Sequence, residues 1–62
     1  MSRAYSVWFG RSVVLQIDAG GSWVPLRGQV VGESGHAVRF RLEGGWEVDV
    51  PKELVLGVEP GN

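Results

Sequence analysis

Apolar and polar residues alternate with a period of two along most of the chain, which is the spacing of β-strands that bury one face. The apolar runs are rich in valine, and glycine-containing clusters at 18–21, 33–35 and 43–45 separate them. A fourth break, at 51–53, contains proline. The pattern predicts an all-β chain without a helix, whose five strands lie at residues 12–17, 23–32, 36–42, 46–50 and 55–58, with residues 4–9 as a candidate extra edge strand.

The third and fourth predicted strands are close enough in sequence for their register to be predicted. A three-residue hairpin loop at 43–45, with one glycine in the left-handed conformation, joins two strands with matched faces. A two-residue loop would place Leu42 opposite Glu47 and mix apolar with charged positions. The three-residue loop therefore predicts a core face on which Leu42 lies opposite Trp46, Phe40 opposite Val48, and Val38 opposite Val50.

The same register predicts a charged outer face. Arg41 lies beside Glu47 and Arg39 beside Asp49, and opposite charges on neighbouring strands attract one another. Two carboxylates on one strand face could also serve acid–base chemistry, but their arginine partners favour a solvated ladder of ion pairs.

The first two strands complete the expected core. Gly28 lies in the inward row, where a glycine is typical of a bulge or bend. Pro25 predicts an edge or bulge because it cannot donate to a ladder, and residues 51–54 have the length of one 3₁₀ turn. The inward residues of these strands are Val13, Leu15, Ile17, Val24, Leu26 and Val30.

Length and composition restrict the chain to one domain, because 62 residues bury too little surface for two cores. The chain has no cysteine and one histidine, His36, so no disulfide, metal or cofactor is predicted. Neither a signal peptide nor a membrane span is apparent, and we expect a cytoplasmic, soluble protein. The net charge of −1 provides no general attraction to phosphate.

Two long and three short strands, with a glycine in the second and a 3₁₀ turn before the last, resemble the SH3-like small barrels. The resemblance covers residues 12–59 and leaves 1–11 as an N-terminal segment and 60–62 as a tail. The segment Leu26-Arg27-Gly28-Gln29-Val30 is similar to the second strand of the Sm-like RNA-binding proteins, which form rings. That family has an N-terminal helix, which is not predicted here, and its RNA-contacting loop has only Lys52 as a counterpart.

A fainter resemblance connects residues 28–32 and Pro51 with the plasmid-encoded type B dihydrofolate reductases, which are tetramers of small barrels around one pore. Their pore-lining segment corresponds here to residues 47–50, which lack its glutamine and tyrosine and contain two acids. An oligomeric enzyme with a site on the symmetry axis is therefore a remote alternative.

Several apolar side chains have no predicted place in the core, and uncovered apolar patches usually mark interaction sites. Either the N-terminal segment covers the sheet or another subunit does. The hypothesis is a non-catalytic binding module that forms a homo-oligomer or docks on a protein partner. Its predicted interface residues are Tyr5, Trp8, Phe9, Val14, Trp23 and Val31.

The alternative hypothesis is a nucleic-acid-binding protein of the Sm-like or SH3-like kind. Basic residues share the outer face with Gln29, and Trp23 at its end would stack on a base. Neighbouring acids reduce the positive field of this surface. The predicted patch consists of Arg27, Arg39, Arg41 and Lys52.

Overall fold

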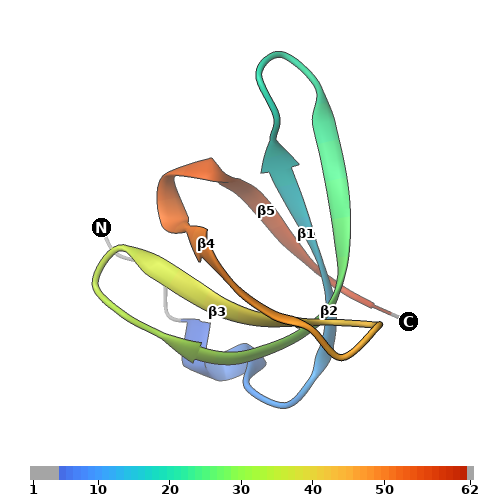
Figure 1. Cartoon of the computed structure of the whole chain (residues 1–62), viewed down its shortest axis with the longest axis vertical. Coiled ribbons are helices and arrows are strands. Elements are labelled where there is room, and N and C mark those ends of the chain that lie inside the picture. The colour runs from blue at the N-terminus through green and yellow to red at the C-terminus, as the bar shows by residue number, and fades with distance from the viewer. Residues whose placement is uncertain (1–4, 62) are drawn as a thin grey trace.

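A computed structural model of the chain describes residues 5–61. Five antiparallel strands form one sheet in the order β4-β3-β2-β1-β5, as Figure 1 shows. The all-β prediction is confirmed, and the predicted 3₁₀ turn before the last strand is present. The elements are η1 (Tyr5–Trp8), β1 (Ser12–Asp18), β2 (Trp23–Glu33), β3 (Ala37–Leu42), β4 (Glu47–Pro51), η2 (Lys52–Leu54) and β5 (Val55–Pro60).

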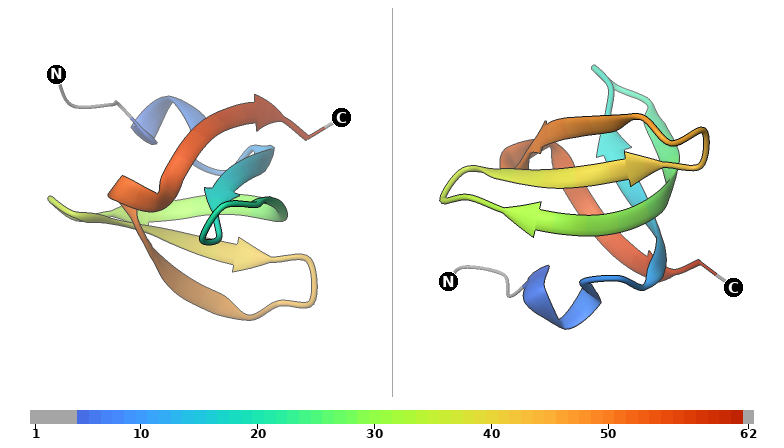
Figure 2. Two further views of the ribbon diagram at one scale, coloured as in Figure 1. Left: turned by 90° about the horizontal axis from the view of Figure 1, so that it is seen from above. Right: turned by 60° about the horizontal axis from the view of Figure 1, so that its bottom comes forward.

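The long strand β2 belongs to two halves of the sheet. Its first part pairs with β1 up to Gln29, and its second part pairs with β3 from Gly28 onward. The two halves run in different directions, so that the β1–β2 hairpin rises away from the β3–β4 hairpin (Figures 1 and 2). Gly28 lies where they meet, and a Cβ atom there would overlap the carbonyl oxygen of Arg41. Of the bulge or bend predicted at Gly28, the change of direction lies at this residue, and the register shift lies between Val30 and Gly32.

Pro25 occupies a position that needs no backbone donor. The Ala19 amide donates to the Ser22 carbonyl at 2.9 Å, which fixes the alternation of the β1–β2 ladder. Pro25 lies opposite Gln16, at a position whose nitrogen faces away from β1, and β3 does not pair with this part of β2. The predicted edge position is therefore confirmed.

The core lies on the inner face of the bent sheet. Phe40, predicted to be inward, is fully buried. Val24, also predicted to be inward, is 40% exposed, because it lies near the end of the β1–β2 hairpin, away from the packed centre. The core cluster consists of Tyr5, Val13, Leu15, Val30, Val38, Phe40, Val50 and Val55, with Trp8, Ile17, Leu26, Leu42 and Val58 packed against it.

The N-terminal segment is a 3₁₀ turn and not the extra edge strand that alternation suggested. Within residues 5–61, its strand-like pairing is a single parallel bridge between Phe9 and Val30, and the Gly10 amide donates to the Val30 carbonyl at 3.1 Å. Residue 4 of the predicted strand lies outside the described residues. η1 thus packs against β2 and inserts Tyr5 into the core.

The two ends of the strand order remain unpaired with each other. β4 pairs with β3, β5 pairs with β1, and no pair joins β4 to β5 within residues 5–61. The sheet is therefore open, with β4 and β5 as the outermost strands of the order. No helix in the described part of the chain is long and apolar enough to span a membrane.

Candidate functional site

The β3–β4 hairpin has the predicted register. Phe40 pairs with Val48, Arg39 with Asp49 and Arg41 with Glu47. The Leu42 amide donates to the Trp46 carbonyl at 2.7 Å, and the Gly45 amide closes the loop on the Leu42 carbonyl at 2.8 Å. Gly45 has a φ of 95°, as the three-residue loop requires.

Trp46 is a correction to the predicted core, because its side chain is 76% exposed. By strand alternation it shares a face with Val48 and with Val50, of which Val50 is buried and Val48 is 38% exposed. Burial therefore decreases along β4 toward the loop, since the core is centred at the other end of the strand. The Trp46 ring lies beside its own turn, where a Cβ at Gly44 would be 3.5 Å from its Cδ1 atom.

The open side of β4 exposes backbone hydrogen-bonding groups. The Leu42–Trp46 bond and a second bond, from the Lys52 amide to the His36 carbonyl at 2.8 Å, fix the alternation of the β3–β4 ladder. Val48 and Val50 accordingly direct their N–H and C=O groups toward β3. Glu47 and Asp49 direct theirs away from it, to a side with no strand partner among residues 5–61.

The outer face of this hairpin holds the predicted ion pairs. Arg39 donates to Asp49 from Nε at 3.1 Å and from a terminal nitrogen at 3.4 Å. Arg41 donates to a single oxygen of Glu47, Oε2, at 3.2 and 2.8 Å. The hydrogen bond to Asp49 and the charges of Asp49 and Glu47 raise the pKa of Arg39, so its guanidinium stays charged. The side chains of Asp49 and Glu47 are nevertheless 59% and 38% exposed.

The other sheet edge, β5, offers less to a partner. The Gly61 amide donates to the Ser12 carbonyl at 2.9 Å, so the positions that face outward include Val58 and Pro60. Pro60 has no N–H to donate, and the β1–β5 register shifts between Gln16 and Ile17. β4 is therefore the more regular edge.

Two of the predicted interface residues are buried within the chain. Tyr5 is 1% exposed because η1 inserts it into the core, and Val14 is 6% exposed because it lies on an inner strand between Arg27 and Glu59. Tyr5 and Val14 therefore cannot anchor a partner as predicted. The Tyr5 hydroxyl is buried without a hydrogen-bond partner in the described structure, and Lys52 Nζ lies 5.6 Å from the ring centroid.

The remaining predicted interface residues differ in exposure. Trp8 is half-buried, with the Arg11 guanidinium 5.5 Å from its ring centroid, and Val31 is half-buried at the β2 bulge. Phe9 is 44% exposed, and Trp23 is 69% exposed at the end of the β1–β2 hairpin. The structure does not bring these residues together into one patch around Trp23, because Trp23 pairs with Asp18 and Phe9 with Val30.

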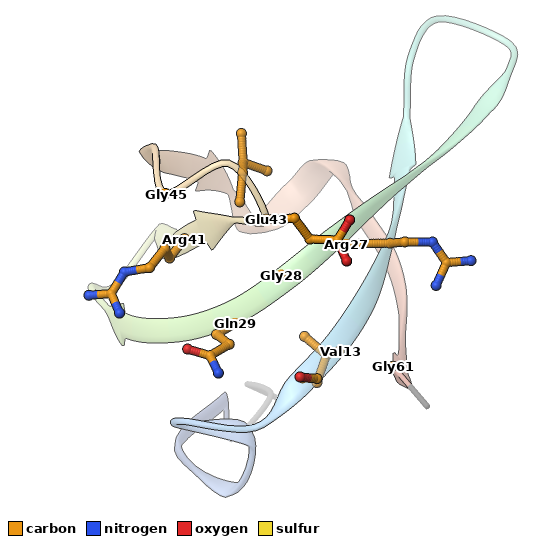
Figure 3. A pocket seen from close by; sticks show the side chains of 10 residues that line it. Val13, Arg27, Gly28, Gln29, Arg41, Glu43, Gly45 and Gly61 are labelled. Atoms are coloured by element: carbon orange, nitrogen blue, oxygen red, sulfur yellow. The ribbon is translucent and has the colours of Figure 1, made fainter.

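Most of the predicted basic patch is neutralised. Arg39 and Arg41 are held by the acids of β4, and Lys52 donates to Glu33 at 2.6 Å. Arg27 borders an open depression of about 540 Å³ that Arg41 also lines. Figure 3 shows the two guanidinium groups pointing away from each other, so they do not converge on a common anion.

No group of three or more His, Cys, Asp or Glu side chains within residues 5–61 has the arrangement of a metal site. Comparisons with protein-family models, with curated proteins and with solved structures find no match for this chain. Exposed apolar side chains and unpaired backbone groups occur together along the β4 edge, and sequence reasoning missed this edge. The first part of β2, where Trp23 and Val24 are exposed and β3 does not pair, is interrupted as an edge by Pro25, which has no N–H. The sequence did contain one indication that Trp46 is exposed. It directly follows the 43–45 loop, and the end of a strand beside a hairpin loop often extends past the packed core.

Proposed function

We propose that this chain is a non-catalytic protein-binding module that pairs an extended segment of a partner protein with the open edge of β4. The observation that carries the proposal is the coincidence of two features on one short strand. Glu47 and Asp49 expose backbone donors and acceptors, and Trp46 and Val48 expose apolar side chains beside them. Strand addition uses this combination, in which backbone bonds provide affinity and alternate side chains provide specificity.

An SH3-like architecture is part of the proposal. The strand order β4-β3-β2-β1-β5, the bend in β2 and the 3₁₀ turn η2 between the two edge strands support it. In this arrangement the two edge strands come together at η2 and separate toward the β3–β4 loop, as the left view of Figure 2 shows. Trp46 lies between that loop and the first residue of β4.

Protein binding has better support than nucleic-acid binding. Three of the four basic residues proposed for phosphate contact are engaged by carboxylates, and net charge does not favour a polyanion. The exposed aromatic Trp46, in contrast, is the type of residue that dominates protein interfaces.

A random-peptide display selection on the full chain tests the proposal. We expect it to recover peptides whose binding is lost in Trp46→Ala, which removes the apolar anchor, and in Asp49→Pro, which removes an outward N–H. Trp23→Ala is the matched control, because Trp23 is an equally large side chain, 69% exposed at the end of the other hairpin.

Peptides that bind all three variants as well as the parent chain would refute docking on β4. Loss of binding in Trp23→Ala with retention in Trp46→Ala would transfer the interface to the β1–β2 hairpin. Circular dichroism of each variant verifies that the sheet is retained.

A further inference from the structure

We infer that the β4 edge selects an extended peptide in which two basic side chains flank one apolar side chain. This inference rests on the proposed function and names the chemistry of the partner. It follows from the alternation of the backbone groups, from the charges on the outer face and from the apolar side chains on the inner face.

The backbone fixes which partner residues lie on which face. Glu47 and Asp49 are two residues apart, and both direct N–H and C=O groups to the open side. In an antiparallel pairing, the partner residues opposite them exchange both backbone bonds and place their side chains on the same face as theirs. Two partner side chains therefore lie beside Glu47 and Asp49, and the intervening one lies beside Val48.

The charges determine the first two of these side chains. Arg41 occupies Oε2 of Glu47, while Oε1 accepts no bond within the described residues. Asp49 is 59% exposed, and each of its oxygens accepts one bond, so both retain acceptor capacity. In each of these two cross-strand pairs, the residue on β3 is positive and the residue on β4 is negative. A basic side chain on the added strand continues this alternation of sign.

The inner face determines the remaining side chains. Val48 is 38% exposed and Trp46 76% exposed, on the face that leads into the core. An apolar residue between the two basic ones covers Val48, and the next inward position, on the side of the loop, covers Trp46. The burial of a large aromatic side chain in such a contact provides much of the affinity.

The chain itself contains a strand of this composition. On the other side of β4, Arg39, Phe40 and Arg41 lie opposite Asp49, Val48 and Glu47. β4 thus already pairs with a basic–apolar–basic segment through one edge. A peptide with the β3 pattern is accordingly the natural probe for the free edge.

A second copy of the chain fits this edge poorly. Pairing β4 with β4 of another molecule would place the carboxylates of Glu47 and Asp49 beside one another. An antiparallel pairing with β5 would place Val58 and Pro60, whose backbone groups face outward, opposite Glu47 and Asp49, and Pro60 has no N–H to donate. Like charges repel in the first arrangement and a donor is missing in the second, so both oppose self-association.

The test is titration of the full chain with three blocked peptides, followed by calorimetry and by amide NMR shifts. Their central sequences are Val-Arg-Phe-Arg-Leu, Val-Thr-Phe-Thr-Leu and Val-Glu-Phe-Glu-Leu, each between Gly-Ser ends. We expect the arginine peptide to bind about tenfold more tightly than the threonine peptide, and the glutamate peptide to bind least. The largest shifts are expected at the Glu47 and Asp49 amides, and the preference should decrease as salt increases.

The double variant Glu47→Gln with Asp49→Asn should bind the arginine and threonine peptides equally. Glu43→Gln with Glu53→Gln is the matched control, since it removes the same charge from two exposed acids of the loop and η2, and it should retain the tenfold preference. Retention of the preference in the first double variant would overturn the inference.

The remaining outcomes distinguish this inference from the proposed function. Equal binding of all three peptides, lost in Asp49→Pro, would overturn the charge rule and leave docking on β4 intact. If the arginine peptide still binds Asp49→Pro, its binding site lies elsewhere on the chain and the inference is overturned. If none of the three peptides binds while display yields ligands that depend on Trp46, the inference about peptide charge is overturned and the proposed binding function is retained. A dimer or ring in light scattering, with β4 amides protected from exchange, would make a second copy the occupant.

Discussion

Tyr5 and Trp46 are both large aromatic side chains, yet one is 1% exposed and the other 76%. Tyr5 belongs to the segment that alternation predicted as an edge strand, and it is buried because that segment forms η1 and folds back onto β2. Trp46 follows the pattern of a core residue and is exposed because its strand extends beyond the packed centre. The comparison teaches that alternation reports which face a residue occupies, whereas burial depends on what lies over that face.

The largest expected effect separates these two residues directly. Tyr5→Ala should lower the free energy of unfolding by about 3–5 kcal/mol, because it leaves a cavity in a fully packed core. Trp46→Ala should change it by less than about 1 kcal/mol, because the ring is mostly in water. Urea denaturation followed by circular dichroism measures both. Similar losses in the two variants would mean that Trp46 belongs to the core after all.

An intermediate effect is expected from proline at adjacent positions of β4. Val48→Pro removes an N–H that faces β3 and leaves the carbonyl of Phe40 without its donor, at a cost of about 1–3 kcal/mol. Asp49→Pro removes an N–H that faces solvent, so its loss of stability should be clearly smaller even though the contact with Arg39 is also removed. Thermal unfolding compares the two variants. A larger loss of stability in Asp49→Pro than in Val48→Pro would mean that the N–H of Asp49, and not that of Val48, faces β3.

The smallest expected effect concerns the Tyr5 hydroxyl. It is buried without a partner in the described structure, so Tyr5→Phe removes an unsatisfied polar group while it keeps the ring. We expect the free energy of unfolding to stay constant or to increase by up to about 1 kcal/mol. If urea denaturation instead shows a decrease of more than about 1 kcal/mol in the free energy of unfolding, the hydroxyl is hydrogen-bonded in solution.

Much of the fold was predictable from local pattern. The register of β3 and β4 followed from the length of the 43–45 loop, and the pairs Arg39–Asp49 and Arg41–Glu47 followed from the register. Pro25 and the η2 turn were also placed correctly. These features depend on residues that are close in sequence, where turn geometry and alternation determine the outcome.

The candidate surface was not predictable in the same way. The interface predicted around Tyr5, Val14 and Trp23 failed at its first two members, which the chain buries. The exposed position of Trp46 and the open side of β4 depend on which strands end the sheet order, and that order joins residues far apart in sequence. Alternation does not contain this information, because both edge and inner strands alternate.

Local sequence pattern set the class of secondary structure, the approximate positions of the five strands of the sheet, the β3–β4 register and the ladder of charges on the outer face. These follow from the period of two and from turn chemistry, which act over a few residues. The tertiary structure alone decided that η1 inserts Tyr5 into the core, that Trp46 stays in solvent and that β4 retains a free edge. The physical reason is that burial and edge exposure arise from contacts between distant segments, and the bend of β2 between the two halves of the sheet sets those contacts.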